Sequence, residues 1–257
     1  MHALTGGMTF TDDEIERYAR HLVLAEVGGP GQQRLKAARV GLIGVGGVGA
    51  PAMLYLAAAG VGTLRLIDDD AVALSNLQRQ IAFSVADIGR PKVEAGAEAL
   101  NALNPHVRVE PVAERLTGAN AARLIAGCDV VIDGTDDFTT RFAVNAACMA
   151  ARIPLVSGAL GRWSGQVGVF TGRPCYRCLA PAAPPDVETC SRVGVVGALA
   201  GVVGSMAALE AIKLVVGAGA SLVGRLLIYD GLAGTARTVS VLADPGCPVC
   251  ASVQGPA

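Results

Sequence analysis

The chain has 257 residues, of which 52% are hydrophobic, 17% charged and 4% aromatic. This length and composition exclude a disordered chain and predict one compact α/β domain with a core of small aliphatic side chains. Its 21 Lys and Arg residues and 22 Asp and Glu residues leave a net charge near −1, which disfavours a general nucleic-acid binder. The three histidines lie far apart in the sequence, so a histidine-rich zinc site is not expected.

The N-terminal sequence has no basic segment followed by a long apolar one, so no secretory signal is predicted and a cytoplasmic location is expected. Residues 193–209 carry no charge, but they are shorter than the roughly 20 residues that a membrane-spanning helix needs. We interpret them as a buried helix. Gly197 and Gly201 would let another backbone approach it closely, in the core or at a subunit interface.

The chain begins with the signature of a helix and continues with a βαβ unit. Residues 11–14 (TDDE) form a predicted capping box before an apolar pattern at Ile15, Tyr18, Ala19 and Leu22. A predicted strand at 39–43 leads through a glycine-rich turn into an Ala-rich helix at 50–60, and a second strand at 63–67 ends in three aspartates.

The same alternation continues towards the C-terminus. Strands are expected at 108–111, 129–133 and 153–157, and helices at 91–103, 119–126 and 138–151. Shorter strands at 166–170, 226–229 and 238–242 are expected to extend the sheet antiparallel, and the proline-rich residues 180–185 to form a mobile loop. The predicted fold is a Rossmann-like, mostly parallel sheet with helices on both faces.

Glycines at positions 44, 46 and 49 fit a phosphate-binding turn between a strand and a helix. Asp68 follows the next strand, where a carboxylate can bind ribose hydroxyls. Together they predict an adenine-nucleotide site without choosing between NAD and ATP. The alternative is that the glycines serve only close packing of helix and strand.

The residues that follow favour a triphosphate. Asn76, Arg79 and Gln80 come just after the acidic strand end, and Lys92 begins the next helix. Cations and amides at this point can compensate the charge of a triphosphate under attack. The alternative, that Arg79 and Lys92 are ordinary surface charges, stays open on spacing alone.

Asp136 and Asp137 follow the strand predicted at 129–133, at the edge where open α/β sheets bind ligands. A carboxylate at this position suits Mg²⁺ bridging the phosphates of ATP. Either residue could instead cap the following helix. With two carboxylates, both roles can be filled.

Two C-x2-C pairs supply four thiols: Cys175 with Cys178, and Cys247 with Cys250. Such a set is typical of a tetrahedral structural zinc site; the alternative is free or redox-active thiols. Two of the remaining cysteines, Cys128 and Cys148, are expected in the core. Cys190 follows the proline-rich loop beside an arginine and is either a covalent participant or an inert loop residue.

These residues occur in motifs that together resemble the MoeB/ThiF family of ubiquitin-activating-enzyme-like adenylyltransferases. The motifs, in order, are RYAR (17–20), GVGGVG (44–49), NLQRQ (76–80), GRPK (89–92), GTDD (134–137), PCYRC (174–178) and PGCPVC (245–250). The resemblance extends from about residue 12 to residue 250. It implies a single adenylation domain with an N-terminal helical region (12–38), a nucleotide-binding half (39–157) and a carrier-binding and zinc half (158–257).

The resemblance implies a homodimer that uses Mg-ATP to adenylate the C-terminal Gly-Gly carboxylate of a small ubiquitin-fold sulfur carrier, MoaD-like or ThiS-like, and releases pyrophosphate. A separate persulfide donor would then supply sulfur, since no rhodanese-like domain follows the second C-x2-C pair. Residues that match the family's nucleotide and magnesium contacts are Gly47, Asp68, Asn76, Arg79, Lys92 and Asp136.

The resemblance also assigns three further roles. Arg20 matches an arginine that reaches the ATP of the neighbouring subunit, Cys190 matches the loop cysteine of sulfur transfer, and the C-x2-C cysteines match zinc ligands. Two positions depart from the family pattern: Asp137 replaces Asn, and His21 replaces Gln. The alternatives are an NAD-dependent oxidoreductase, a non-catalytic carrier-binding scaffold and a relative that activates a carboxylate on tRNA.

Overall fold

The fold is built on one eight-stranded sheet. The computed structural model describes residues 9–183 and 194–251. The strand order is β3-β2-β1-β4-β5-β6-β7-β8; the first five strands run parallel, and the last three continue the sheet antiparallel. The strands are β1 (Arg39–Ile43), β2 (Thr63–Ile67), β3 (Arg108–Val112), β4 (Val130–Asp133), β5 (Leu155–Gly161), β6 (Ser164–Phe170), β7 (Arg225–Asp230) and β8 (Thr235–Ser240).

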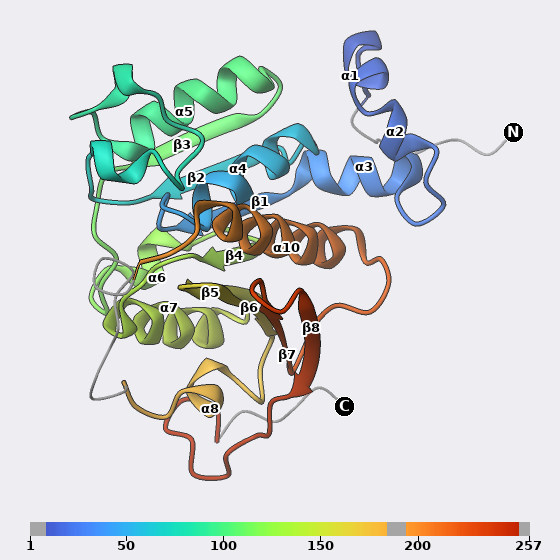
Figure 1. Ribbon diagram of the computed structural model, residues 1–257. Helices are drawn as coiled ribbons and strands as arrows, with labels where there is room; N and C mark the ends of the chain where they lie inside the picture. Colours follow the sequence, from blue (N-terminus) through green and yellow to red (C-terminus); the bar gives the residue numbers. More distant parts are fainter. Residues whose placement is uncertain (1–8, 184–193, 252–257) are drawn as a thin grey trace, which may run out of the picture.

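Helices cover both faces of this sheet (Figure 1). On one face lie α3 (Gly28–Ala37), α4 (Gly49–Ala58), α5 (Lys92–Leu103) and α10 (Gly197–Val216). On the other lie α6 (Ala121–Leu124), α7 (Phe138–Ala151) and α8 (Tyr176–Leu179). Each face has its own apolar core, and the predicted doubly covered α/β architecture is confirmed.

The central strands are buried on both faces because their sequences are almost continuously apolar. All four residues of β4 are buried, as are four of the five in β1, which is the pattern expected of a parallel sheet covered by helices. The two strands pair with each other, yet the chain runs from β1 to β2 on one side and reaches β4 on the other. Strand order therefore reverses at the β1–β4 boundary.

The long helix α10 packs against α4 and the strands β5 and β6. Its 20 residues are long and apolar enough to cross a membrane by length and composition alone. However, half of its most apolar stretch is buried within the protein. A Cβ at Gly197 would lie 2.0 Å from the Gln78 carbonyl oxygen, which confirms the predicted close approach there.

At Gly201 the predicted approach does not occur in the core, because nothing in the described ranges lies within 4 Å of a Cβ built there; the subunit interface stays a prediction. The close contact falls one helical turn later. A Cβ at Gly204 would lie 2.4 Å from both Pro51 Cγ and the Val48 carbonyl oxygen. Absence of a side chain there lets α10 pack tightly on α4.

The N-terminal helix begins as predicted but is interrupted. Thr11 and Glu14 form the capping box of α1 (Asp12–Arg17), and a second short helix, α2 (Ala19–Leu22), follows Tyr18. Ile15 does not face the core as its spacing predicts, since 47% of it is exposed. Ala19 of the same pattern is also exposed, whereas Tyr18 is buried as predicted, and its ring occupies the space that a side chain at Gly60 would fill.

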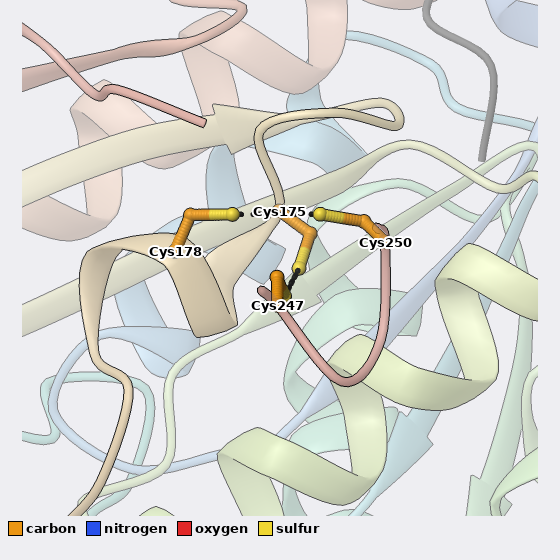
Figure 2. Close-up of side chains that lie close together, drawn as sticks. All are labelled: Cys175, Cys178, Cys247 and Cys250. Carbon is orange, nitrogen blue, oxygen red and sulfur yellow. Dashed lines mark hydrogen bonds between the residues drawn. The ribbon is translucent and has the colours of Figure 1, made fainter. Parts of the chain in front are cut away.

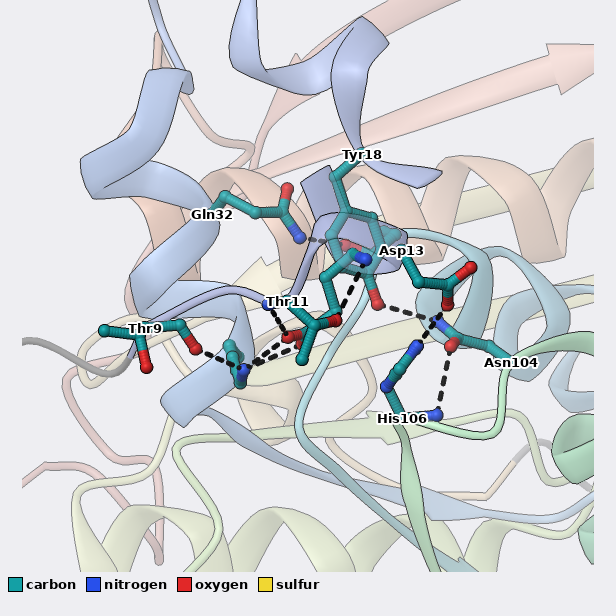
Figure 3. Close-up of polar contacts among 10 residues, drawn as sticks. Thr9, Thr11, Asp13, Tyr18, Gln32, Asn104 and His106 are labelled. Carbon is teal, nitrogen blue, oxygen red and sulfur yellow. Dashed lines mark hydrogen bonds and ion pairs between the residues drawn. The ribbon is translucent and has the colours of Figure 1, made fainter. Parts of the chain in front are cut away.

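Polar contacts fix the N-terminal helices to the turn between α5 and β3 (Figure 3). Asn104 Nδ2 donates to the Tyr18 hydroxyl at 2.9 Å, and His106 Nε2 lies 2.6 Å from Asp13 Oδ2. The buried Glu14 carboxylate on α1 also pairs with Lys36 on α3, at 2.8 Å. These contacts hold α1 and α2 in a defined orientation beside the sheet.

Other predicted elements differ in extent, among them β5, which was expected at 153–157 and occupies Leu155–Gly161. The helix expected at 119–126 is only α6, and the last strand lies three residues before its predicted start, at Thr235–Ser240. Its register is set by the hairpin, in which Asp230 pairs with Thr235. Leu242, predicted inside the strand, is 83% exposed. Two short 3-10 helices, Leu74–Asn76 and Val85–Asp87, lie between β2 and α5.

Candidate nucleotide site and cysteine cluster

A cavity of about 360 Å³ opens at the carboxyl ends of β1 and β4. This is the point where the strand order reverses, and ligands of open α/β sheets bind at such switch points. The volume is within the range of small-molecule sites. The predicted residues that line it are Gly44, Gly46, Gly47, Asp68, Asn76, Arg79, Gln80, Lys92, Asp136 and Asp137.

The glycine loop lies directly over the end of β1. Gly44 has φ +83°, and a Cβ there would lie 3.3 Å from the Thr135 backbone nitrogen. Gly46 and Gly47 line the cavity. Gly49 lies outside the lining, and a Cβ there would be 2.0 Å from the Gly44 carbonyl oxygen. Gly46 and Gly47 thus face the cavity, whereas Gly49 allows the turn to pack closely.

Asp68 holds the glycine loop in place. Its Oδ2 accepts a hydrogen bond from Val45 N at 2.7 Å, and its Oδ1 accepts one from Asp70 N at 2.8 Å. Burial raises the pKa of the Asp68 carboxyl, against the opposing charge of Lys92. Sequence reasoning predicted a ribose contact at Asp68 but not this bond to the loop, which depends on how β1 and β2 pair.

Lys92 is buried in the cavity wall. Its ammonium lies 2.6 Å from Asp70 Oδ2 and 4.0 Å from Asp68 Oδ1, and only 6% of its side chain is exposed. The interpretation of Lys92 as an ordinary surface charge is therefore wrong. Lys92 is the first residue of α5, and the preceding Pro91 ends the loop that leads into the helix.

Three polar side chains from the segment after β2 complete that side of the cavity. Arg79 donates to the Ser75 carbonyl at 3.0 Å, and Asn76 Oδ1 accepts from Ala73 N at 3.1 Å. Gln80 is 3% exposed, and its Oε1 has no hydrogen-bond partner in the part of the chain that the structure describes. A buried amide oxygen in a cavity wall is available to a ligand donor.

The two aspartates at the end of β4 have different environments. Asp137 caps α7, accepting from Thr140 N at 2.8 Å. Asp136 is exposed in the cavity lining, with no hydrogen-bond partner for its side chain among residues 9–183 and 194–251. The alternative left open by the sequence is resolved: Asp137 is the cap, which leaves Asp136 available to a cation.

The sequence analysis missed Arg141 and Asp133. Arg141 is 5% exposed; it donates to Ser157 Oγ at 3.0 Å, to the Gly158 carbonyl at 2.8 Å and to the Thr135 carbonyl. Asp133 Oδ1 accepts from Thr135, whereas its buried Oδ2 has no partner in the described segments. The available signal for Arg141 was its spacing of three and seven residues from Val144 and Cys148, which places it on the same buried side of α7.

Arg20 is not brought to this cavity by the described chain. Arg20 lies exposed on α2 and does not contribute to the lining. Arg17 on the neighbouring helix donates to the Leu103 carbonyl at 3.0 Å. Cys190 lies outside the described residues.

The four C-x2-C cysteines come together on the side of the sheet that α7 covers (Figure 2). All four Sγ atoms lie within 4.8 Å of one another, with Cys175 and Cys247 3.7 Å apart and Cys178 and Cys250 3.4 Å apart. Tetrahedral zinc with Zn–S bonds near 2.3 Å places sulfurs about 3.8 Å apart. The donor set and its spacing therefore fit a zinc ion.

The surroundings of the cluster act in opposite directions on its thiols: burial raises the pKa of Cys175 and of Cys250, whereas the pKa of Cys247 is lowered. Burial would raise the pKa of the Cys247 thiol, but backbone N–H groups of Cys250 and Val249 lower it to about 7. Asn145 Nδ2 donates to Cys175 Sγ at 3.6 Å, and Asp244 N donates to Cys178 Sγ at 3.4 Å. Donors to sulfur stabilise the charged form that binds metal.

The other two described cysteines are core residues, as predicted. Cys128 and Cys148 are buried among the side chains between the sheet and helices α6 and α7. Burial raises the pKa of Cys128 to about 11, so this thiol stays protonated at neutral pH.

The fold and cavity define an α/β protein of the doubly wound, nucleotide-binding class. The chain belongs to the ThiF family, whose model matches residues 18–249. This confirms the resemblance drawn from the sequence motifs. The match covers the glycine loop, the cavity residues and three of the four clustered cysteines.

The chain is similar over nearly its whole length to three curated relatives. It is 47% identical over 240 residues to the SAMP-activating enzyme E1 of Haloferax volcanii, covering 92% of this chain and 89% of the relative. It is 44% identical over 252 residues to the sulfur carrier protein adenylyltransferase of Thermus thermophilus (95% and 93%). It is 46% identical over 243 residues to the molybdopterin-synthase adenylyltransferase of Escherichia coli (93% and 98%).

Solved structures of MccB from Escherichia coli share the fold. One, described with MccA-N7isoASN, matches with a TM-score of 0.82 at 22% identity over 92% of this chain and 74% of that chain. Another, described with ATP, matches with a TM-score of 0.78 at 20% identity over 95% and 83%. At these identities the likeness concerns the arrangement of strands and helices.

Proposed function

We propose that this protein uses ATP to adenylate the C-terminal Gly-Gly carboxylate of a small ubiquitin-like sulfur carrier protein, releasing pyrophosphate. The observation that carries the proposal is the cavity at the β1–β4 switch point, where the glycine loop, the cations Arg79 and Lys92 and the free carboxylate of Asp136 face one space. The names of the similar proteins, which include sulfur carrier and molybdopterin-synthase adenylyltransferases, support it.

The chemistry explains this combination of groups. Attack of a carboxylate on the α-phosphorus brings two anions together, so the site must supply positive charge and positioning rather than a strong base. Arg79 and Lys92 supply that charge, and the backbone of the glycine loop allows phosphates to come close. Asp70 holds the Lys92 ammonium in position. Because the Asp70 side chain is 66% exposed, it can move away from the ammonium when a phosphate binds.

Magnesium is part of the proposal. Asp136 would hold Mg²⁺, which neutralises phosphate charge when bound. Asp137, which stands where the family has Asn, adds a negative charge beside it. Arg115 Nη2 lies 3.8 Å from Asp137 Oδ2 and offsets part of that charge.

Zinc has a structural role in this proposal. Cys175, Cys178, Cys247 and Cys250 would hold one Zn²⁺ with no open coordination position. The ion joins the C-terminal segment to residues 72 positions earlier in the chain. It thereby fastens the two ends of the proposed carrier-binding and zinc half (158–257) to each other.

The finer assignments follow the family resemblance. The active form is proposed to be a cytoplasmic homodimer in which Arg20 completes the partner's nucleotide site, and a separate persulfide protein supplies sulfur. Cys190 is proposed to act after adenylation. An NAD-dependent hydride transfer is a weaker explanation, because it leaves the cations Arg79 and Lys92 in the lining and the cysteine cluster without a role.

Carrier-dependent exchange of radiolabelled pyrophosphate into ATP tests the proposal. Each candidate carrier, MoaD-like or ThiS-like, is incubated with the protein and Mg-ATP, and the intact mass shows which one gains AMP. The matched control is the same carrier without its terminal Gly-Gly. Two outcomes would contradict the proposal: pyrophosphate exchange that proceeds in the absence of a carrier protein, and no exchange with any of the candidate carriers. Reduction of NAD by the protein would favour an oxidoreductase.

A further inference from the structure

Two buried polar residues lie one turn apart on α7, on the side that faces the sheet. Arg141 is 5% exposed and Asn145 is fully buried. Residues four apart on a helix share one face. Because buried polar groups are costly unless they are bonded, their partners show what this face holds together.

Asn145 contacts the cysteine cluster with both ends of its amide. Its Nδ2 donates to Cys175 Sγ at 3.6 Å, and its Oδ1 accepts from Tyr176 N at 2.9 Å. Asn145 itself does not line the nucleotide cavity. It therefore fixes the start of α8 from outside both the proposed metal ligands and the nucleotide site.

Tyr176 carries this contact to the cavity. It lies between the cluster residues Cys175 and Cys178 and also lines the nucleotide cavity. Its ring packs edge-to-face on Phe170, with centroids 5.7 Å apart, and lies 5.8 Å from the Arg141 guanidinium. A shift of Cys175 would thus move a wall of the cavity.

Arg141 continues the connection to the end of β4. It donates to the carbonyl of Thr135, which follows β4, and to the carbonyl of Gly158, which lies in β5. Thr135 precedes Asp136, the proposed magnesium ligand. The path from the sulfurs to Asp136 therefore passes through the buried side chains of Asn145, Tyr176 and Arg141 and ends at the Thr135 backbone carbonyl.

We propose that Asn145 is a positioning residue that couples metal binding at the cysteine cluster to nucleotide binding in the cavity. This rests on the proposed function, in which the cluster holds zinc and the cavity holds ATP. A metal ion fixes Cys175; Asn145 and Tyr176 convey that position to Arg141 and the Asp136 loop. Such coupling is reciprocal, so bound nucleotide must also raise the affinity of the cluster for metal.

The test measures zinc affinity of the full-length protein by equilibrium competition with a chelator, with and without a non-hydrolysable ATP analogue in excess Mg²⁺. In the wild type the analogue should raise zinc affinity about fivefold or more. In Asn145→Ala, zinc affinity without nucleotide should fall about 10- to 100-fold, as for residues that support metal ligands. The increase caused by nucleotide should also disappear.

Asn104→Ala is the matched control. Asn104 is another fully buried asparagine, but it bonds to Tyr18 and Ala57 on the opposite face of the sheet. The variant loses comparable buried bonds, so it should be destabilised while the effect of nucleotide on zinc affinity persists. If Asn104→Ala abolished that effect as fully as Asn145→Ala, general destabilisation would explain both and the proposal would be overturned.

Asn145→Asp serves if Asn145→Ala does not fold. It keeps the oxygen that accepts from Tyr176 N and loses the donor to Cys175 Sγ. It should bind zinc more weakly than wild type. Calorimetric titration with the ATP analogue separates the two levels of the argument: no nucleotide binding by zinc-loaded wild type would contradict the proposed function, whereas normal nucleotide binding with unchanged zinc affinity would overturn only the coupling.

Discussion

The ammonium of Lys92 lies 2.6 Å from Asp70 Oδ2, inside a cavity wall that leaves 6% of the lysine side chain but 66% of the aspartate side chain exposed. The pair is thus asymmetric: Lys92 is fixed and Asp70 is free to turn towards solvent. An anionic phosphate entering the cavity can take the place of the Asp70 carboxylate without an unpaired buried charge being left behind.

Lys92→Met should therefore lower carrier-dependent pyrophosphate exchange by about 100-fold or more, since a charge aimed at the reacting phosphates is removed. The control is Lys36→Met, which breaks the 2.8 Å pair with the buried Glu14 far from the cavity. That variant should lose stability and retain exchange. Exchange near the wild-type level in folded Lys92→Met would remove Lys92 from the catalytic set.

Asp136→Ala should mainly reduce activity, whereas Asp137→Ala should mainly reduce stability. Asp136 has no structural bond in the described chain, so its removal should nearly abolish adenylation and leave the melting temperature unchanged. Asp137 caps α7, and loss of a cap costs about 1 kcal/mol, which corresponds to roughly 2–4 °C for a domain of this size. Melting curves and exchange assays on the pair decide between the roles, and an active Asp136→Ala protein would contradict the magnesium assignment.

Local signals were enough to predict most of the fold. The apolar strands β1 and β2, the capping box at Thr11 and the full extent of α7 were read from neighbouring residues, because propensity and capping act over short distances. The extent of β8 was not, since its register depends on pairing with β7.

In the candidate site, the residues that could be predicted are those that belong to a recognisable local motif. Gly44, Lys92 and Asp136 stand at element ends, and parallel strands bring those ends to one edge. Arg141 and Asn145 were missed because their partners come from other elements: β5 for Arg141 and the start of α8 for Asn145. Spacing within a helix cannot show which distant carbonyl or sulfur will lie opposite.

Glu14 gives a pH prediction. Burial opposes ionisation of its carboxyl, but hydrogen bonds from Lys36 and Thr11 lower its pKa below the usual 4.5. A carboxyl with a lowered pKa in the folded state contributes stability that is present above its unfolded pKa and is lost as pH falls through the folded value. Glu14→Gln should thus be less stable than wild type at pH 7, with a difference that shrinks below about pH 4.5.

Denaturant unfolding of both proteins from pH 7 to pH 3 measures this difference. Glu16→Gln is the control, because Glu16 is an exposed residue on the same helix. It should show little difference from wild type across the range. A stability gap for Glu14→Gln that stays constant with pH would contradict the ion-pair explanation.

The cysteine cluster should hold one zinc ion per chain. Cys178→Ser and Cys247→Ser should each lose the metal and melt at lower temperature, because the ion joins two segments 72 residues apart. Cys128→Ala, which removes a buried core thiol outside the cluster, should keep its zinc. Metal analysis of protein purified without added zinc checks this, and a metal-free wild type with a normal melting curve would refute it.

The last prediction concerns Arg20, which is exposed on α2 and absent from the lining of its own chain's cavity. The contacts of Tyr18 and Asp13 hold the N-terminal helices away from that cavity. If Arg20 acts in the partner's site, as the family resemblance implies, Arg20→Ala and Asp136→Ala homodimers should both be nearly inactive, since an arginine supplied to a triphosphate is worth on the order of 10³-fold in rate.

Mixing these two variants under conditions of proven subunit exchange should restore activity. In each heterodimer one site carries both defects and the other carries neither, so activity should approach half of the wild-type value per heterodimer. The control mixes wild type with the Arg20→Ala, Asp136→Ala double variant, which places one defect in each site and should give inactive heterodimers. An arginine that acts within its own chain reverses the pattern: the first mixture stays inactive and the second keeps one working site.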